Sequence, residues 1–353
     1  MARIQKQFEQ FHDNIKLGHY DECEELREKR ERVLSALKEG MDRISKDKGV
    51  TFPGYRTFNQ GSYAMYTGIK PLDSDYDIDI GVCFKLSKDD YDPVEVKKWV
   101  YDALNGHTER VELRRSCVTV FYQLEEEPIY HVDLAIYSDE TCNTDEKTYL
   151  AKGKQYSDED NRYWEEADPQ GLIKAITEYS DDTHDRKQFR RIVRYLKRWK
   201  DHNFSNEGNE APVGIALTVA AYRWLSPVYD VYDSFSGKRE YDDLEALLNL
   251  VDTMLSNFTL QYLDDEWVDR LTVELPVIPY NDLLQKMTNK QMEKFEDKLR
   301  KLRSTLDDAK KETDPIEACR SLTSQFGVDF PVPPKEDTAS KIPPGIVGSS
   351  LSA

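Results

Sequence analysis

The chain has 353 residues, a length that favours two domains or one bilobed domain with ample sequence for a hydrophobic core. Its 67 acidic residues exceed its 49 basic residues, and the formal net charge at pH 7 is −18. This charge disfavours long nucleic acids as partners, because binding them normally requires a basic surface, but it permits a local basic pocket for nucleoside triphosphates (NTPs).

The first part of the chain predicts a small mixed α/β sheet. Residues 20–46 are rich in charge and carry apolar residues at helical spacing, which indicates a long amphipathic helix. A short turn and helix are expected after Gly61-Ser62, and a further helix over residues 93–104. Strands are expected over residues 55–58, 76–84, 110–122 and 130–137. This alternation of strands and helices is typical of a mixed sheet with flanking helices.

The pattern becomes helical from Asp168 onward. Asp168 can cap a helix, and Pro169 suits its first position. Further helices are expected over residues 186–202, 212–225, 241–256, 283–311 and 315–325. The predicted fold class is therefore α+β and bilobed, with a sheet lobe over residues 1–167, including the long N-terminal helix, and a helical lobe over 168–330. Residues 331–353 are rich in Pro, Gly and Ser and predict a flexible tail.

Three aspartates lie in two of the predicted strands. Asp77 and Asp79 share one face of their strand, because side chains alternate, and Ile78 lies on the other face. Asp133 lies in the second strand, so pairing of the two strands would bring three carboxylates onto one open surface. Crowded carboxylates repel one another unless cations neutralise them, and oxygen ligands of this kind suit Mg²⁺. The pattern predicts a two-metal site for nucleotidyl transfer.

A calcium-binding loop is an alternative interpretation of this acidic segment. An EF-hand loop requires Gly at its sixth position and Glu at its twelfth. Counting from Asp73 places Ile78 and Phe84 at these positions, and counting from Asp75 fits no better. The sequence therefore excludes an EF-hand. A solvated acidic turn explains Asp73 and Asp75, but not the two aspartates that lie among Ile and Val.

Two further features indicate a phosphate-binding pocket. Gly61 and Ser62 lie between a predicted strand and a helix, where a glycine permits close approach of a phosphate and a serine hydroxyl can hold its oxygens. The dense basic stretch at residues 186–200 carries Arg194 and Lys197 beside an apolar stripe. We expect these two side chains to reach the triphosphate, Lys197 foremost, because lysine acts as a mobile point charge.

The cysteines and the apolar segments indicate the cellular compartment in which the protein is expected. The five cysteines are scattered, with no Cys-x-x-Cys pair, which indicates a reducing cytoplasm and argues against a zinc site. No apolar run is long enough to span a bilayer, and residues 1–6 lack the apolar core of a signal peptide. We expect a cytoplasmic protein with no membrane partner.

Taken in order, these motifs resemble those of the DNA polymerase β-like nucleotidyltransferases, whose signature is Gly-Ser, an Asp-x-Asp strand and a third Asp on a neighbouring strand. The chain more closely resembles the bacterial CD-NTases, relatives of the cholera dinucleotide cyclase and of animal cyclic GMP–AMP synthase. The resemblance covers about residues 55–330. It also rests on the sequences at 162–164, 194–199 and 325–327.

The resemblance implies a function and a set of site residues. Residues 1–167 would be the catalytic lobe, and residues 168–330 would close the nucleotide cleft. Two Mg²⁺ ions, which Mn²⁺ could replace, would be held by the catalytic residues Asp77, Asp79 and Asp133. The nucleotide would be contacted by Gly61, Ser62, Arg194 and Lys197. The chain departs from the family at Gly214, where relatives often carry a phosphate-contacting Ser.

Enzymes of this family join NTPs into cyclic di- or trinucleotide signals for defence against phage and release pyrophosphate. The resemblance therefore implies NTP substrates. It also implies operon-encoded partners, either an activator or a conjugating enzyme that acts on the C-terminal tail, as in some relatives.

Two alternatives are compatible with the same sequence. Another template-independent nucleotidyltransferase, whether oligoadenylate-forming, polyadenylating or adenylylating a small substrate, would use the same three acids. A non-catalytic nucleotide sensor would bind the NTP without releasing pyrophosphate. The intact acids and the Gly-Ser pair favour an enzyme.

Overall fold

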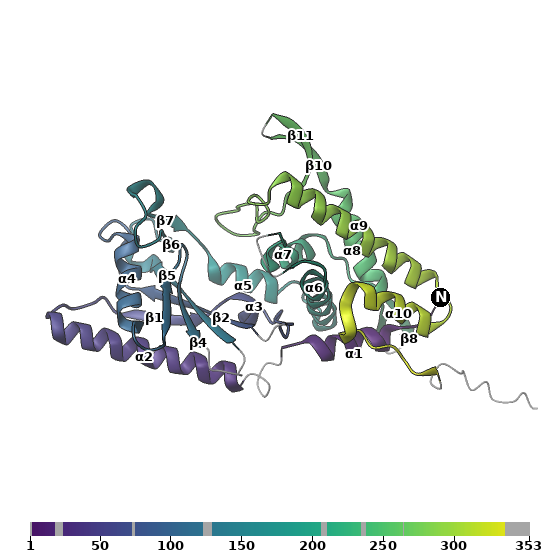
Figure 1. The fold of residues 1–353 in the computed structure, drawn as a ribbon, viewed down its shortest axis with the longest axis horizontal. Coiled ribbons are helices and arrows are strands. Elements are labelled where there is room, and N and C mark those ends of the chain that lie inside the picture. The colour runs from purple at the N-terminus through teal and green to yellow at the C-terminus, as the bar shows by residue number, and fades with distance from the viewer. Residues whose placement is uncertain are drawn as a thin grey trace, which may run out of the picture.

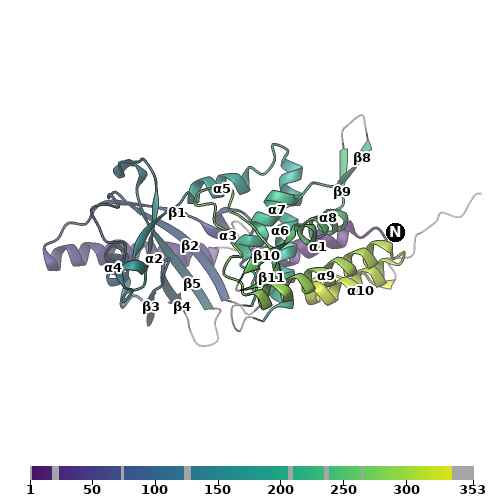
Figure 2. The same ribbon diagram turned by 90° about the horizontal axis from the view of Figure 1, so that it is seen from above.

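The computed structural model describes residues 2–17, 24–72, 75–122, 129–205, 210–233, 238–263 and 265–335. Within these ranges the chain forms two lobes that lie side by side, a seven-stranded sheet with flanking helices and a mainly helical lobe (Figures 1 and 2). The predicted α+β class and bilobed architecture are confirmed.

The sheet is built around the parallel pair β2 and β5, to which antiparallel neighbours add on both sides. The order along its main path is β1-β2-β5-β4-β3, and β6 and β7 extend it from the end of β5. Its strands in the described chain are β1 (Tyr55–Asn59), β2 (Asp75–Phe84), β3 (Arg110–Leu113), β4 (Val118–Tyr122), β5 (Ile129–Ser138), β6 (Tyr149–Lys152) and β7 (Tyr163–Glu166).

The single strand predicted over residues 110–122 is wrong. The segment is the hairpin β3–β4, whose turn is closed by a hydrogen bond from the Arg114 N–H to the Cys117 carbonyl (2.9 Å). Residues that favour strands occupy both arms, so propensity does not reveal where the chain reverses. The strands β6 and β7 were not predicted, because four residues are too few to show a period.

Two helices cover one face of the sheet. α2 (Glu24–Lys48) and α4 (Pro93–Leu104) pack on the apolar side chains of β2 and β5, including the buried Ile80 and Val132. The Asp92 carboxylate accepts hydrogen bonds from two backbone N–H groups of the first turn of α4, which explains where that helix begins. The opposite face of β2, which carries Asp77 and Asp79, therefore faces away from these helices.

The helical lobe confirms the helices predicted after residue 168, although α9 begins six residues later than expected. A reciprocal cap between Thr288 and Gln291 marks its start. The helices of this lobe within the described ranges are α1 (Gln5–Ile15), α5 (Pro169–Thr177), α6 (Thr183–Asn203), α7 (Gly214–Trp224), α8 (Asp243–Ser256), α9 (Asn289–Lys311) and α10 (Pro315–Phe326). None of the helices in the described part of the chain combines the length and apolar character needed to cross a bilayer.

Two hairpins in this lobe were not predicted. β8 (Tyr229–Asp233) pairs with β9 (Lys238–Tyr241), and β10 (Phe258–Leu263) pairs with β11 (Glu266–Leu271). The second hairpin projects from the lobe at the top of Figure 1. Its exposed strands bury too little apolar surface to give the alternation by which strands are recognised.

Helix α1 packs in the helical lobe, not in the sheet lobe. Phe8 and Phe11 are fully buried there, and the Phe11 ring stacks on Tyr195 of α6 with centroids 5.2 Å apart. The predicted division placed residues 1–167 in one lobe, and the structure differs from it at the N-terminus. The cause is the apolar face of α1, which fits the helical core and was not recognised in the sequence.

The predicted flexible tail begins directly after the helical core. Phe330 is buried against Phe8 and Phe11, and residues 331–334 follow it without a helix or strand. The rest of the predicted tail, residues 336–353, lies outside the described residues.

Candidate functional site

The three predicted aspartates lie on the sheet face opposite α2 and α4. The parallel register pairs Asp79 with Asp133 and Asp77 with His131, which confirms the expected pairing of the two strands. The side chains of all three aspartates therefore project from one face. Asp77 is exposed, and Asp79 and Asp133 are half-buried.

Neighbouring strands hold two of these carboxylates in place. Thr119 on β4 donates its hydroxyl hydrogen to Asp133 Oδ1 (2.5 Å). His131 Nδ1 lies 3.7 Å from Asp77 Oδ1, and the edge of its ring packs on Phe121, with centroids 4.7 Å apart. The cross-strand contacts thus orient the outer two carboxylates of the group.

Asp79 is the electrostatic centre of the group. Burial is the largest cause that raises the pKa of Asp79 to about 7, and the charges of Asp77 and Asp133 raise it further, while Lys197 acts in the opposite direction. Three carboxylates that repel one another on a partly buried surface are a donor set that fits hard divalent cations such as Mg²⁺.

Gly61 at the start of α3 (Gly61–Ala64) lies directly against this group. Its φ is +68°, and a Cβ added there would lie 1.8 Å from Asp79 Oδ2. The preceding Gln60 N–H donates to the Asp79 carbonyl (3.1 Å). Position 61 therefore requires glycine both for its backbone conformation and for the close approach of Asp79.

A cavity of about 490 Å³ opens beside these residues, between the sheet and the helices α5, α6 and α7. We call it the catalytic cavity. Of the predicted site residues, it is lined by Gly61, Ser62, Asp77, Asp79 and Lys197. Asp133 and Arg194 do not line it.

Other lining residues were missed by the sequence reasoning. They are the polar side chains Gln60, Tyr137, Lys200, Asp201 and Thr218. The Tyr137 hydroxyl donates to Gln60 Oε1 (3.0 Å), which joins β5 to the turn before α3. Gln60 precedes the Gly-Ser pair, and Lys200 follows Lys197 by one helical turn, so helical spacing could have indicated Lys200.

Lys197 lies in the wall of the catalytic cavity. Its Nζ donates to the carbonyl and to Oγ1 of Thr67 (3.0 and 3.2 Å). Burial, followed by the charge of Arg194, lowers the pKa of Lys197 to about 7. Gly214 lines the same wall, where an added Cβ would lie 3.8 Å from Lys197 Cε. The Thr218 hydroxyl lies one turn further along α7 and also lines the cavity.

Arg194 points elsewhere. It donates to the carbonyls of Tyr66 (2.7 Å) and Gly68 (3.0 Å), and its Nη1 lies 2.9 Å from Nε2 of His12. The structure therefore does not bring Arg194 to the catalytic cavity, contrary to the sequence prediction. Arg194 lies about one turn before Lys197 on α6, so helical spacing alone would place both on one face. The packing of α1 beside α6 instead brings Arg194 to His12.

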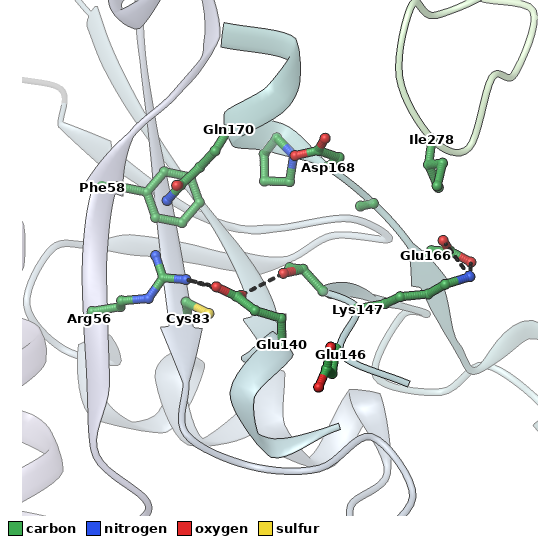
Figure 3. Close-up of a pocket in the computed structure, with 13 residues that line it drawn as sticks. Arg56, Phe58, Cys83, Glu140, Glu146, Lys147, Glu166, Asp168, Gln170 and Ile278 are labelled. Carbon is green, nitrogen blue, oxygen red and sulfur yellow. Dashed lines mark hydrogen bonds and ion pairs between the residues drawn. The ribbon is translucent and has the colours of Figure 1, made fainter. Parts of the chain in front are cut away.

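A smaller cavity of about 300 Å³ lies beside β1, β2 and the start of α5 (Figure 3). On one side Arg56 contacts Glu140 (3.3 Å), and on the other Lys147 contacts Glu166 (2.9 Å). These polar side chains are paired with one another, and they lie apart from the three aspartates.

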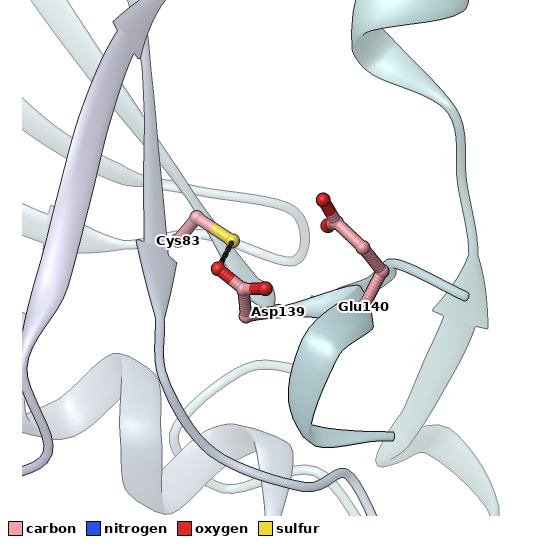
Figure 4. A group of neighbouring side chains, drawn as sticks. All are labelled: Cys83, Asp139 and Glu140. Carbon is pink, nitrogen blue, oxygen red and sulfur yellow. Dashed lines mark hydrogen bonds between the residues drawn. The ribbon is translucent and has the colours of Figure 1, made fainter. Parts of the chain in front are cut away.

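Cys83, Asp139 and Glu140 adjoin this cavity (Figure 4), and their ligand atoms lie within 4.8 Å of one another. Among the described residues the three aspartates, as placed, do not meet this spacing. Burial raises the pKa of the Cys83 thiol to about 12, and Arg56 forms ion pairs with both carboxylates. A protonated thiol and neutralised carboxylates make a poor metal site.

Comparison with known proteins links this geometry to one family. Residues 55–137 match the family described as "Cyclic GMP-AMP synthase DncV-like, nucleotidyltransferase domain". A cyclic GMP-AMP synthase of Escherichia albertii is 33% identical over 174 residues, which cover 46% of this chain and 36% of that protein. The chain thus spans about a third of that relative's length. A c-di-GMP synthase of Roseivirga ehrenbergii is 24% identical over 294 residues, which cover 72% of this chain and 73% of the relative.

Solved structures of Vibrio cholerae DncV share the whole fold. The apo form gives a TM-score of 0.67 at 17% identity and covers 92% of this chain and 96% of that chain. A complex of the same protein with nonhydrolyzable GTP gives 0.66 at 17% identity, with 91% and 96% covered. The sequence match includes β1, the Gly-Ser pair, β2 and most of β5, and therefore all three aspartates. Residues 55–137 are thus similar to the DncV-like nucleotidyltransferase domain, and the chain shares the fold of DncV.

Proposed function

We propose that the chain is a template-independent nucleotidyltransferase that joins NTPs into a cyclic di- or trinucleotide and releases pyrophosphate. The observation that carries the proposal is the group of Asp77, Asp79 and Asp133 on one sheet face beside a cavity that also exposes Ser62 and Lys197. The two relatives, a cyclic GMP-AMP synthase and a c-di-GMP synthase, favour a cyclic dinucleotide as the product.

The carboxylates of Asp77, Asp79 and Asp133 would hold two divalent cations, for which Mg²⁺ is the proposed identity. When bound, such ions lower the pKa of an attacking hydroxyl and offset the charge on the attacking and leaving oxygens. The raised pKa of Asp79 supports this assignment, because a cation at the site would favour the ionised carboxylate that burial disfavours.

The chain's own residues would bind and orient the nucleotide. Asp133, held by Thr119, would accept the proton of the ribose hydroxyl that attacks the α-phosphate. The Ser62 hydroxyl and Lys197 would contact the triphosphate, and a phosphate near Lys197 would raise the low pKa of this amine and so favour its charged form. Closure of the helical lobe over the cavity would exclude water from the transfer.

We extend the proposal to the biological role. The resemblance to the CD-NTases, together with the match of residues 55–137 to a DncV-like nucleotidyltransferase domain, supports a cytoplasmic enzyme whose product signals phage infection and whose partners, an activator or a conjugating enzyme, are encoded nearby. NTP substrates are supported by the catalytic cavity, whose volume of about 490 Å³ suits a ligand of this size.

Pyrophosphate release from NTPs in the presence of Mg²⁺ tests the proposed chemistry. The wild-type chain should release pyrophosphate, and Asp77→Asn and Asp133→Asn should each reduce the rate by about 100-fold or more, because each removes a charge at the reacting centre. Asp265→Asn, at an exposed hairpin position, is the matched control and should keep the wild-type rate. If Asp77→Asn and Asp133→Asn release pyrophosphate as fast as the control Asp265→Asn, the assignment of the site is refuted.

A further inference from the structure

A second cavity, of about 560 Å³, lies between α1, α6 and the segment that follows β1. We call it the α1–α6 cavity, and we call residues 61–68 the wall segment. Ser62 lines both this cavity and the catalytic cavity, while Met65 lines the catalytic cavity and Tyr66 lines the α1–α6 cavity. The wall segment therefore separates two spaces, each large enough to hold a small ligand.

The α1–α6 cavity is strongly cationic in an acidic protein. Two carboxylates, Glu9 and Asp13, face five basic side chains: Lys16, Lys187, Arg190, Arg191 and Arg194. Lys16 pairs with Asp13 (2.8 Å), and Arg191 pairs with the buried Asp243 (2.6 Å). Lys187 and Arg190 form no ion pair with any residue that the structure describes, so Glu9 is the one lining carboxylate left to face them and Arg194.

Arg194 carries a buried charge without a carboxylate partner among the described residues. It is 8% exposed, and its hydrogen-bond partners are two carbonyls and His12. Burial, followed by the charges of Arg194 and Arg191, lowers the pKa of His12 to about 4, so His12 is neutral and does not add to the positive charge. Arg190 lies one turn earlier on α6, with its guanidinium 4.7 Å from the centroid of the Tyr66 ring.

Positive side chains that lack carboxylate partners favour the binding of an anion in this cavity. A buried or half-buried guanidinium is stabilised by a partner that accepts several hydrogen bonds, and phosphate oxygens match the planar fork of arginine. Lys187 adds a mobile point charge at the rim of the same cavity.

We propose that the α1–α6 cavity binds a small phosphate-bearing anion and that this anion controls the wall segment. Arg194 donates to the carbonyls of Tyr66 and Gly68, and Lys197 donates to the carbonyl of Thr67 between them. A phosphate that attracts Arg194 competes with these carbonyls. The wall segment then moves, and with it Ser62 of the catalytic cavity.

Two sources share this chemistry: a nucleotide, and inorganic pyrophosphate. Binding of the anion does not depend on the proposed function. Control of the catalytic cavity deepens that function, because it would make the enzyme respond to its substrate or its product.

Isothermal titration of the full chain tests the binding. Pyrophosphate, ATP and GTP are titrated separately in EDTA, so that metal-dependent binding in the catalytic cavity does not contribute. The Lys187→Gln/Arg190→Gln variant should bind the preferred probe at least tenfold more weakly than wild type. The Lys286→Gln/Lys301→Gln variant, which loses two exposed charges on another surface, should bind as wild type does.

The outcomes distinguish a nucleotide from inorganic pyrophosphate as the ligand, and they can refute the proposed binding site. Equal affinities for pyrophosphate and the nucleotides identify an inorganic ligand, and tighter binding of ATP or GTP identifies a nucleotide. Equal binding by wild type and the Lys187→Gln/Arg190→Gln variant, or no saturable binding of any probe, refutes the proposal. Circular dichroism of each variant verifies that it is folded.

Hydrogen exchange of residues 61–68 tests the control of the wall segment. The preferred probe should change the exchange rates of these amides in the wild-type chain and leave them unchanged in the Lys187→Gln/Arg190→Gln variant. Unchanged rates in a wild-type chain that binds the probe refute the control. Since neither measurement uses turnover, a chain that binds the anion but forms no nucleotide product refutes the proposed function alone.

Discussion

Asp79 shows how the fold maintains a destabilised carboxylate. Its neighbour across the sheet is Asp133, its neighbour along the strand is Asp77, and Gly61 closes over it from α3. Substitution of any one of these neighbours would reduce the crowding around the Asp79 carboxylate. The register of β2 and β5 nevertheless keeps the three acids together. This arrangement is typical of a site whose stability is completed by a bound cation.

The pKa of Asp79 predicts a pH-dependent stability in EDTA. The folded state holds the proton up to about pH 7, whereas the unfolded chain releases it near pH 4, so the stabilisation is full below pH 4 and is lost as the pH rises through 7. Asp79→Asn should therefore be as stable as wild type at pH 4 and more stable by about 1 to 3 kcal/mol at pH 8. Urea unfolding at several pH values measures the difference.

The control for this experiment is Asp265→Asn, which should show no such trend. Adding Mg²⁺ at pH 8 should stabilise wild type more than Asp79→Asn, because the cation binds the folded carboxylates. A wild-type chain whose stability relative to Asp79→Asn does not fall between pH 4 and pH 8 would contradict the account.

Gly61 offers a second test at this scale. Gly61→Ala places a methyl group 1.8 Å from the present position of Asp79 Oδ2, so Asp79 must move, and NTP turnover should fall by about 100-fold. Gly49→Ala is a matched control, because Gly49 has a similar φ of +63° and no atom within 4 Å of the added Cβ. Both variants should lose about 1 to 2 kcal/mol of stability from the left-handed backbone. Turnover that falls equally in both would show that backbone strain, not contact with Asp79, is the cause.

Among the elements, α1 is the one whose position differs from the predicted division of the chain into a sheet lobe and a helical lobe. It lies far from the rest of the helical lobe in sequence, yet it packs against α6, α8 and α10 (Figure 1). Gln5 Oε1 accepts the N–H of Asp243, and the Tyr195 hydroxyl donates to the Phe8 carbonyl. Helix α1 thereby forms one wall of the α1–α6 cavity and contributes to the core of the helical lobe.

Phe11→Ala should destabilise the helical lobe by about 3 to 5 kcal/mol, because it leaves a cavity beside Tyr195, Phe326 and Phe330. Hydrogen exchange should become faster in α6 and α10 and should change less in β2 and β5. Tyr156→Ala, at a side chain that is 90% exposed, should change stability by about 0.5 kcal/mol or less. Faster exchange confined to the sheet would show that α1 belongs to the sheet lobe after all.

The elements that the sequence predicted are those with a long, regular period. The strands β2 and β5 alternate over ten residues, and a side-chain cap marks the start of α5, α6, α8, α9 and α10. The Asp-Ile-Asp motif and Asp133 could be placed on one face because alternation is a local property. Hairpin β3–β4 could not be resolved, because both of its arms favour strands.

The sequence also could not show which cavity each basic side chain of α6 faces. Arg194 and Lys197 lie one turn apart in the same basic stretch, and only the packing of α1 shows that they face different cavities. Thr218 and Gln60 reach the catalytic cavity through contacts between elements, which a single sequence does not record.

Over the whole molecule, the distribution of charge agrees with a small anionic substrate. The net charge is −18, yet Lys197 and Lys200 line the catalytic cavity between the two lobes. An acidic surface repels long nucleic acids, while a local pair of lysines can attract a triphosphate. The seven-stranded sheet supplies the acids and the helical lobe supplies the lysines, so both lobes are needed for the proposed reaction.

The product that the full chain makes from all four NTPs and Mg²⁺ tests the central claim most directly. The products are treated with phosphatase and identified by mass spectrometry, with Asp77→Asn alongside. We predict a cyclic di- or trinucleotide that resists phosphatase and is absent from the variant. A linear oligonucleotide with phosphatase-sensitive ends, or transfer only to an added acceptor, would contradict the account and favour another nucleotidyltransferase. NTPs that bind but are not consumed would instead indicate a nucleotide sensor.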